Sequence, residues 1–117
     1  MFRIRRIHVE ILPVNQEAVR QVQEIFRAQF PLANAGDAEK LSEQLQKPLE
    51  SGLQTLLYVA ENSTQKVMGF ALVLYDQQLK FCYLDYLASS KGAIGRGIGG
   101  ALYERARQDA VALRATV

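Results

Sequence analysis

The sequence predicts an α+β fold (α/β mixed) with a mostly antiparallel central sheet flanked by helices. Residues 55–88 contain three apolar runs of strand length that are separated by short polar links, which is the pattern of an antiparallel meander. The segments on either side space their apolar residues at the period of a helix. Because 117 residues with 49% hydrophobic composition suffice for one compact core, we expect a single domain over residues 1–117.

The first expected element is a strand over residues 2–12, where apolar residues recur at about every second position until Pro13 ends it. Its Arg3, Arg5 and Arg6 form the densest basic cluster of a chain whose net charge is +2. Nucleic-acid or anionic-membrane binding usually needs a contiguous basic face. We therefore interpret the three arginines as a solvated strand face, with no nucleic-acid or membrane partner.

Two helices should follow this strand. Asn15 can cap the first helix, which Pro31 ends, and Asp37 can cap the second after a loop over residues 31–36. The second helix carries an i, i+4, i+8 apolar stripe made of Leu41, Leu45 and Leu49.

The second half of the chain predicts three strands and one helix. Residues 55–61, 67–75 and 80–88 are apolar at most positions, so we expect central strands covered by helices on both faces. Residues 98–113 form an amphipathic helix. Its apolar face consists of Ile98, Leu102, Ala106, Ala110 and Leu113. The expected order is strand, helix, helix, strand, strand, strand, helix.

Cysteine and histidine content excludes several kinds of site. With one cysteine, Cys82, and one histidine, His8, the chain has no intrachain disulfide, and we expect no metal site. Cys82 is expected to be a small buried hydrophobic residue. No segment resembles a signal peptide or a membrane span of about 20 apolar residues, so we expect a cytoplasmic protein.

The segment "KGAIGRGIGG", residues 91–100, contains five glycines directly before the last predicted helix. Glycine lets the backbone approach a ligand closely, and the first N–H groups of a helix have no acceptor within the helix. Such a helix start binds phosphate well, and Lys91 and Arg96 add positive charge. A tight turn would explain one or two glycines, but five favour a phosphate-binding loop.

Two other phosphate-binding loops fit less well. A P-loop is excluded, because no Lys-Ser or Lys-Thr pair follows these glycines. Gly95, Gly97 and Gly100 match the dinucleotide fingerprint G-x-G-x-x-G. That motif belongs in a parallel βαβ unit with an acidic residue about 20 positions later, whereas this loop follows a meander and the chain ends 17 residues after Gly100.

The segment "GRGIGGALYERA" resembles motif A of the GNAT superfamily of acetyl-CoA-dependent N-acetyltransferases, whose signature is Gln/Arg-x-x-Gly-x-Gly/Ala. The signature glycines correspond to Gly97 and Gly99, and the Gln/Arg position falls on Ile94, which departs from the pattern. "KVMGFALVLY" and "FCYLDYLAS" look like the third and fourth strands of the family. The resemblance therefore covers essentially the whole chain.

The resemblance implies transfer of an acetyl group from acetyl-CoA to a primary amine by direct attack, without a covalent enzyme intermediate and without a metal. Backbone N–H groups of residues 97–101 would hold the pyrophosphate of coenzyme A, and residues 87–89 would pair with its pantetheine arm. Residues 31–37 would line the acceptor side. The implied cofactor-binding residues are Leu87, Ala88, Ser89, Ile94, Gly95, Arg96, Gly97, Ile98, Gly99, Gly100 and Ala101.

Asp85 and Tyr86 are the candidate catalytic residues, and with Tyr83 they are the polar side chains expected to face the reacting centre. A buried, unpaired carboxylate in so apolar a strand would have a raised pKa, which suits the base that removes the ammonium proton. A buried Asp85 paired with an arginine or with backbone amides is the structural alternative.

The sequence also departs from the family, because the strands and the helix that usually follow this point are absent. We therefore expect a truncated acetyltransferase domain, whose activity in this form is doubtful, with an exposed fourth strand that a second copy covers in a homodimer. A non-catalytic coenzyme A-binding or protein-interaction module is the alternative function. The acceptor, a small-molecule or peptide amine, is not readable from the sequence.

Overall fold

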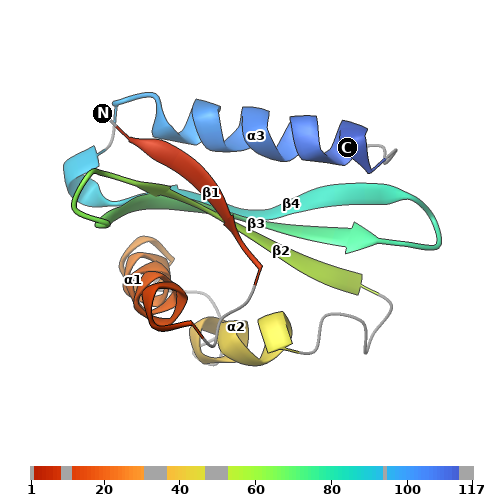
Figure 1. Ribbon diagram of the computed structural model, residues 1–117, viewed down its shortest axis with the longest axis horizontal. Helices are drawn as coiled ribbons and strands as arrows, with labels where there is room; N and C mark the ends of the chain where they lie inside the picture. Colours follow the sequence, from red (N-terminus) through yellow and green to blue (C-terminus); the bar gives the residue numbers. More distant parts are fainter. Residues whose placement is uncertain (1, 9–11, 31–36, 47–52, 94, 114–117) are drawn as a thin grey trace.

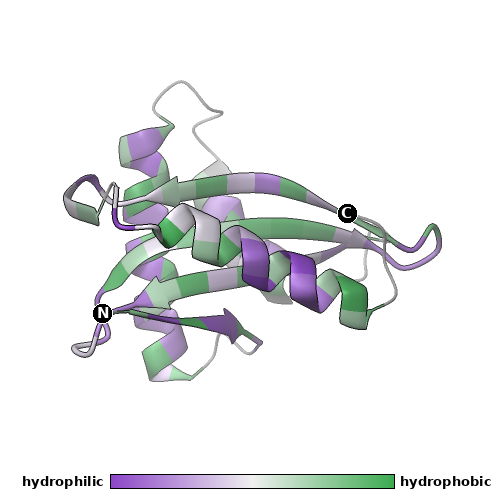
Figure 2. Cartoon of the chain, turned by 90° about the horizontal axis from the view of Figure 1, so that it is seen from above, coloured by the Kyte–Doolittle hydropathy of each residue, from purple (hydrophilic) through white to green (hydrophobic). Residues whose placement is uncertain are grey.

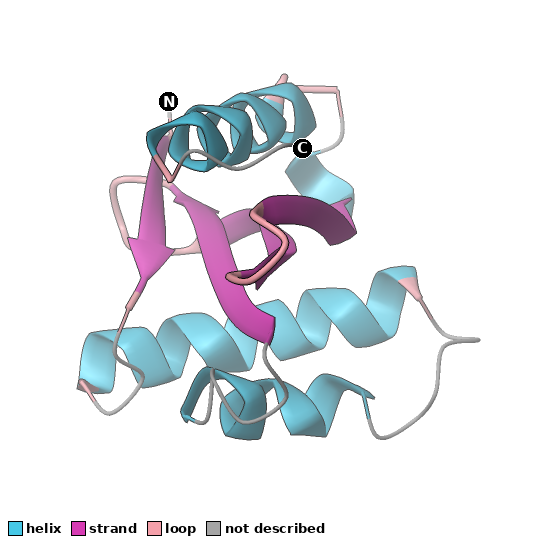
Figure 3. Cartoon of the chain, turned by 90° about the vertical axis from the view of Figure 1, so that its right-hand side faces the viewer, coloured by secondary structure: helices cyan, strands magenta, loops and turns pink. Residues whose placement is uncertain are grey.

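The computed structural model describes residues 2–8, 12–30, 37–46, 53–93 and 95–113. It contains a four-stranded antiparallel sheet in the order β1-β2-β3-β4, with α1 and α2 on one face and α3 on the other (Figures 1 and 3). The predicted α+β fold is confirmed. The elements are β1 (Arg3–Ile7), α1 (Pro13–Gln29), α2 (Asp37–Gln46), β2 (Leu53–Glu61), β3 (Val67–Asp76), β4 (Phe81–Ser89), the short 3-10 helix η1 (Lys91–Ala93) and α3 (Ile98–Ala112).

Two buried clusters hold the three layers together, because successive strand side chains point to opposite faces of the sheet. Under α1, Val59 and Phe70 pack with helix residues such as Val22. Under α3, Tyr58 and Val73 pack with helix residues that include Leu102 and Ala110. Figure 2 shows α3 lying along the strands with hydrophilic bands on its outer side. The prediction of three central strands covered on both faces is confirmed for β2 and β3 and is wrong for β4, which is the outer strand of the described sheet and is exposed at residues 83–85.

The start of α1 differs from the prediction. Leu12 is the N-cap and Pro13 is the first helical residue, so Asn15 lies inside the first turn and does not cap the helix. Proline suits that position, because its fixed φ is helical and its missing N–H would have no acceptor there. The predicted strand 2–12 is also too long, since β1 ends at Ile7. Residues 9–11 lie outside the described part of the chain.

The predicted solvated arginine face is wrong for Arg5. The Arg5 guanidinium donates from Nε to Oε1 of Glu61 at 2.6 Å and from Nη2 to Oε2 at 3.3 Å, and Glu61 is buried on β2. Nη1 donates to Oδ1 of buried Asn15 at 2.6 Å. A buried carboxylate needs such a partner, because desolvation without compensation costs several kcal/mol. Arg5 therefore joins β1, β2 and α1.

Three smaller predictions can be followed in the structure. Cys82 is buried, as predicted, and burial raises the pKa of its thiol. In α2, Leu41 is buried and Leu45 partly buried, whereas Leu49 and the side chain of Asp37 lie outside the description. Within the described segments, no helix is both long enough and apolar enough to cross a membrane.

Candidate active site

The glycine-rich loop is anchored at both ends and exposed between them. Ala93 and Ile98 are buried in the cluster under α3, and residues 95–97 between them are exposed. Gly95 has φ of 86° and Gly97, the N-cap of α3, has φ of 76°. Side chains other than glycine are strained in this left-handed region. The turn itself therefore explains two of the five glycines.

Gly99 and Gly100 need a different explanation. Both lie in the first turn of α3, and neither has a positive φ. A Cβ on Gly100 would meet nothing within 4 Å, and one on Gly99 would meet only Cδ2 of Leu87 at 3.9 Å. Alanine would favour the helix by up to about 1 kcal/mol at each position. The fold does not require these glycines, and without their Cβ atoms the first turn of α3 is open to close approach.

The same helix turn presents free hydrogen-bond donors. The Ala101 N–H donates to the carbonyl of Gly97 at 3.1 Å. Helix geometry leaves the N–H groups of Ile98, Gly99 and Gly100 without an acceptor inside the helix. The first turn of α3 has no acidic residue, and exposed Arg96 precedes it. These features suit a phosphate group, because the N-terminal end of the helix dipole and the Arg96 side chain are both positive.

The free edge of β4 lies beside this loop. The Ser90 N–H donates to the carbonyl of Met68 on β3, and alternation then directs the backbone polar groups of Leu87 and Ser89 away from β3. Those of Ala88 point toward β3. The carbonyl of Ser89 accepts a hydrogen bond from Nε2 of Gln29 at 2.9 Å. Of residues 87–89, Leu87 and Ser89 can pair with a bound molecule through the backbone, and Ala88 cannot.

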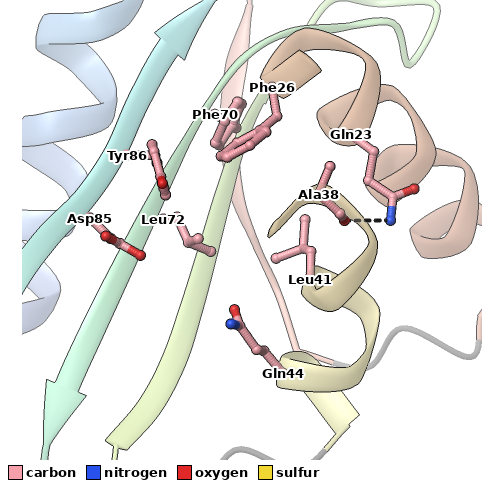
Figure 4. Close-up of a pocket in the computed structure, with 9 residues that line it drawn as sticks. All are labelled: Gln23, Phe26, Ala38, Leu41, Gln44, Phe70, Leu72, Asp85 and Tyr86. Atoms are coloured by element: carbon pink, nitrogen blue, oxygen red, sulfur yellow. Dashed lines mark hydrogen bonds between the residues drawn. The ribbon is translucent and has the colours of Figure 1, made fainter. Parts of the chain in front are cut away.

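A β-bulge in β4 places the candidate catalytic residues. Leu72 of β3 pairs with Tyr86 and Val73 pairs with Leu84, so Asp85 is an extra residue in the strand. A bulge of this kind lets two successive side chains lie on one face. Asp85 and Tyr86 consequently both face the layer of α1 and α2, as Figure 4 shows.

A pocket of about 220 Å³ lies between this bulge and the two helices. In Figure 4, Asp85 and Tyr86 enter it from β4, and Gln44 extends toward the strands from α2. The sequence did not indicate its other members, because the apolar ones show only the spacing of core positions and Gln23 and Gln44 are ordinary polar residues of a helix. The lining residues are Gln23, Phe26, Ala38, Leu41, Gln44, Phe70, Leu72, Asp85 and Tyr86.

Tyr86 is held by aromatic neighbours on α1. Its ring lies edge-on to Phe26 with a centroid separation of 4.6 Å, and 5.0 Å from the ring of Phe30. Phe26 in turn lies 6.5 Å from Phe70 on β3. Edge-to-face and tilted pairs of this kind stabilise one ring orientation. Tyr86 therefore forms a rigid wall of the pocket.

Two expectations about β4 are corrected. Asp85 is exposed, so the expectation of a buried carboxylate is wrong. Tyr83 does not line this pocket, because its ring stacks on Phe81 at 5.8 Å on an exposed part of the strand. The structure thus brings Asp85 and Tyr86 together and separates Tyr83 from them. Ile94 and residues 31–36 lie outside the described residues.

Gly69 on β3 sets how closely α3 approaches the sheet. A Cβ at this position would lie 2.8 Å from the carbonyl oxygen of Ala88 and 2.8 Å from Cγ2 of Ile98. We expect Gly69→Ala to lower the free energy of unfolding by about 2 kcal/mol, because a rigid backbone atom must move. Gly92→Ala, whose Cβ meets nothing within 4 Å, should change it by less than about 0.5 kcal/mol. Urea unfolding checks both, and equal stabilities would contradict the contact.

The described part of the chain thus combines a glycine-rich helix start with unpaired N–H groups, the outer edge of an edge strand and an adjoining pocket. The model of the acetyltransferase (GNAT) family matches residues 19–117. The chain belongs to this family, as the resemblance implied. No curated protein sequence matches the chain.

Solved structures share the fold at low sequence identity. An aminoglycoside acetyltransferase from an uncultured soil metagenomic sample, in complex with sisomicin, has a TM-score of 0.72 and 21% identity over 99% of this chain and 73% of that chain. The catalytic domain of the Tetrahymena GCN5 histone acetyltransferase, in complex with coenzyme A, has a TM-score of 0.68 and 16% identity. This match covers 93% of this chain and 61% of that chain. An aminoglycoside 6'-N-acetyltransferase complexed with coenzyme A has a TM-score of 0.70 and 13% identity, and the match covers 95% of this chain and 56% of that chain.

Proposed function

We propose that this protein transfers an acetyl group from acetyl-CoA to a primary amine. The observation that carries the proposal is the bare first turn of α3, where Gly99 and Gly100 have no structural reason to be glycine. Coenzyme A is bound in the structures of two proteins that share the fold, the GCN5 domain and the 6'-N-acetyltransferase, which supports the same ligand here.

The residues at this end of the sheet fit the parts of coenzyme A. The N–H groups of Gly97, Ile98, Gly99 and Gly100 would hold the pyrophosphate, and exposed Arg96 would add charge. The expected donor at Ala101 is not available, because its N–H already donates to the carbonyl of Gly97. Gly95 would let the loop pass close to the phosphates. The outward backbone groups of Leu87 and Ser89 would bind the pantetheine arm, which contains amides able to pair with a strand edge.

Acetyl-CoA, when bound, supplies an activated thioester. The neutral amine nitrogen attacks the thioester carbonyl carbon, so that an N–C bond forms and the C–S bond breaks, and the departing thiolate takes up a proton. Asp85 would bind the ammonium group and accept or relay its proton to solvent, which its exposure permits. Tyr86, fixed by Phe26 and Phe30, would orient the amine next to Asp85.

The proposed homodimer concerns the same outer edge of β4, of which the pantetheine arm would use Leu87 and Ser89, and it stays a prediction. β4 is the outer strand of the described sheet, and Leu84 and Tyr103 are exposed beside it. An exposed apolar strand edge is a surface on which a second copy can pair.

Calorimetric titration with acetyl-CoA, followed by an assay of thiol release with a panel of primary amines, tests the proposal. We expect saturable binding at one site and thiol release that depends on the amine. Binding without transfer to any amine would favour a non-catalytic coenzyme A-binding module. Absence of acetyl-CoA binding would overturn both functions.

A further inference from the structure

The composition of the pocket beside Asp85 limits the amine that it can accept. Phe70 and Leu72 of β3 form its floor, and Phe26 and Leu41 cover it from the helices. Among the lining residues that the structure describes, Asp85 is the one that carries a charge. Among the described lining residues an ammonium group therefore has one charged partner, at the strand, and the others are apolar or carry the neutral amides of Gln23 and Gln44 and the hydroxyl of Tyr86.

The helices around the pocket use several of their carboxylates internally. Glu17 and Glu24 both pair with Arg20 along α1. Glu39 of α2 pairs with Arg27 of α1 at 2.8 Å. Two arginines pair with these three carboxylates, and none of the three lines the pocket, so they offer little attraction to additional ammonium groups of a ligand.

The size and the shape of the pocket favour a small apolar body. Its volume of about 220 Å³ lies below the roughly 300–1,000 Å³ of pockets that enclose drug-sized ligands. A single ring or a short alkyl chain fits such a space. The rings of Phe26, Phe70 and Tyr86 meet in tilted and edge-on arrangements, which also suit an aromatic guest.

We infer that the acceptor is a primary monoamine with a compact aromatic or aliphatic body, its ammonium at Asp85 and its body between Phe26 and Leu72. This inference rests on the proposed function. A second ammonium at the far end of the molecule would enter the apolar floor, and burying a charge without a partner is strongly unfavourable. Polyamines and aminoglycosides, which carry several ammonium groups, are therefore disfavoured.

Hexylamine and 1,6-diaminohexane form a matched pair for the test, because they differ by one terminal ammonium group. Their binding to the protein in the presence of coenzyme A is measured by calorimetry, and their acetylation by thiol release from acetyl-CoA. We expect hexylamine to bind at least about 30-fold more tightly and to show a correspondingly higher kcat/KM.

Gln44→Glu tests the assignment within the protein. Gln44 is exposed on α2 and lines the pocket, so a glutamate there adds a second carboxylate without disturbing the core. The preference for hexylamine over 1,6-diaminohexane should fall about 10-fold. Gln16→Glu makes the same change on an exposed position of α1 that does not line the pocket, and should leave the preference unchanged.

The outcomes separate the inference from the function on which it rests. Acetylation of 1,6-diaminohexane or an aminoglycoside at least as fast as hexylamine would overturn the monoamine assignment and leave acetyl transfer intact. Binding of hexylamine with the expected preference but no acetylation would support the pocket assignment and overturn the proposed transfer. Absence of hexylamine binding would overturn the monoamine assignment directly.

Discussion

Gly97→Val is expected to weaken acetyl-CoA binding by at least about 100-fold. A valine side chain at the N-cap of α3 would stand in front of the free N–H groups of the first turn, where a Cβ finds open space in the protein. Loss of two hydrogen bonds to a charged phosphate, each contributing about 1.5 kcal/mol, gives this factor. Calorimetric titration with acetyl-CoA measures it.

Two control variants separate obstruction from backbone strain. Valine at residue 97 must adopt a φ of 76°, which should cost about 1–2 kcal/mol of stability. Gly100→Val places the same side chain on a helical backbone with open space, so it should weaken binding without lowering the unfolding free energy. Gly92→Val changes an open position in η1 and should leave the affinity within about 2-fold. Wild-type affinity for acetyl-CoA in both Gly97→Val and Gly100→Val would contradict binding of the pyrophosphate at the first turn of α3.

Asp85→Asn is expected to lower kcat/KM for the amine by about 100-fold. Asparagine keeps the shape of the side chain at the bulge but carries no charge and does not accept the ammonium proton, and general base catalysis typically contributes a factor of about 10² to 10⁴. The deficit should narrow as the pH approaches about 10, because the free amine then loses its proton without help. Thiol release at saturating acetyl-CoA, followed across pH, measures both effects.

The matched control for Asp85→Asn is Glu43→Gln. Glu43 is an exposed carboxylate on α2 that does not line the pocket, so removing its charge should leave kcat/KM within about 2-fold. Asp85→Asn should also retain the wild-type affinity for acetyl-CoA, since Asp85 lines the pocket proposed for the acceptor and not the start of α3. Unchanged turnover in Asp85→Asn would mean that the proton leaves without this carboxylate.

Much of the fold can be predicted from local patterns. Residues 67–76 and 81–89 are strands in the structure within a residue or so of the predicted bounds, because continuous apolar runs bounded by turns have few other structures available. The glycine-rich segment 91–100 is likewise readable, since glycine before an amphipathic helix has a local physical meaning.

The errors concern residues whose partners are far away in the sequence. Arg5 is tied to Glu61, 56 positions later, and nothing near either residue indicates the pair. Asn15 is a plausible cap by composition, but Pro13 already begins the helix and the Asn15 side chain meets Arg5 instead. In both cases tertiary contacts decide what a polar side chain does.

The candidate site shows the same division. The sequence alone determined the glycine-rich helix start that we propose binds phosphate, because a helix start and its glycines are local properties of residues 95–101. The tertiary structure decided the pocket that we propose for the acceptor, because the bulge at Asp85 exists only through pairing with β3. That extra residue turns Tyr86 from the α3 face toward Phe26 and places it beside Asp85 in one pocket.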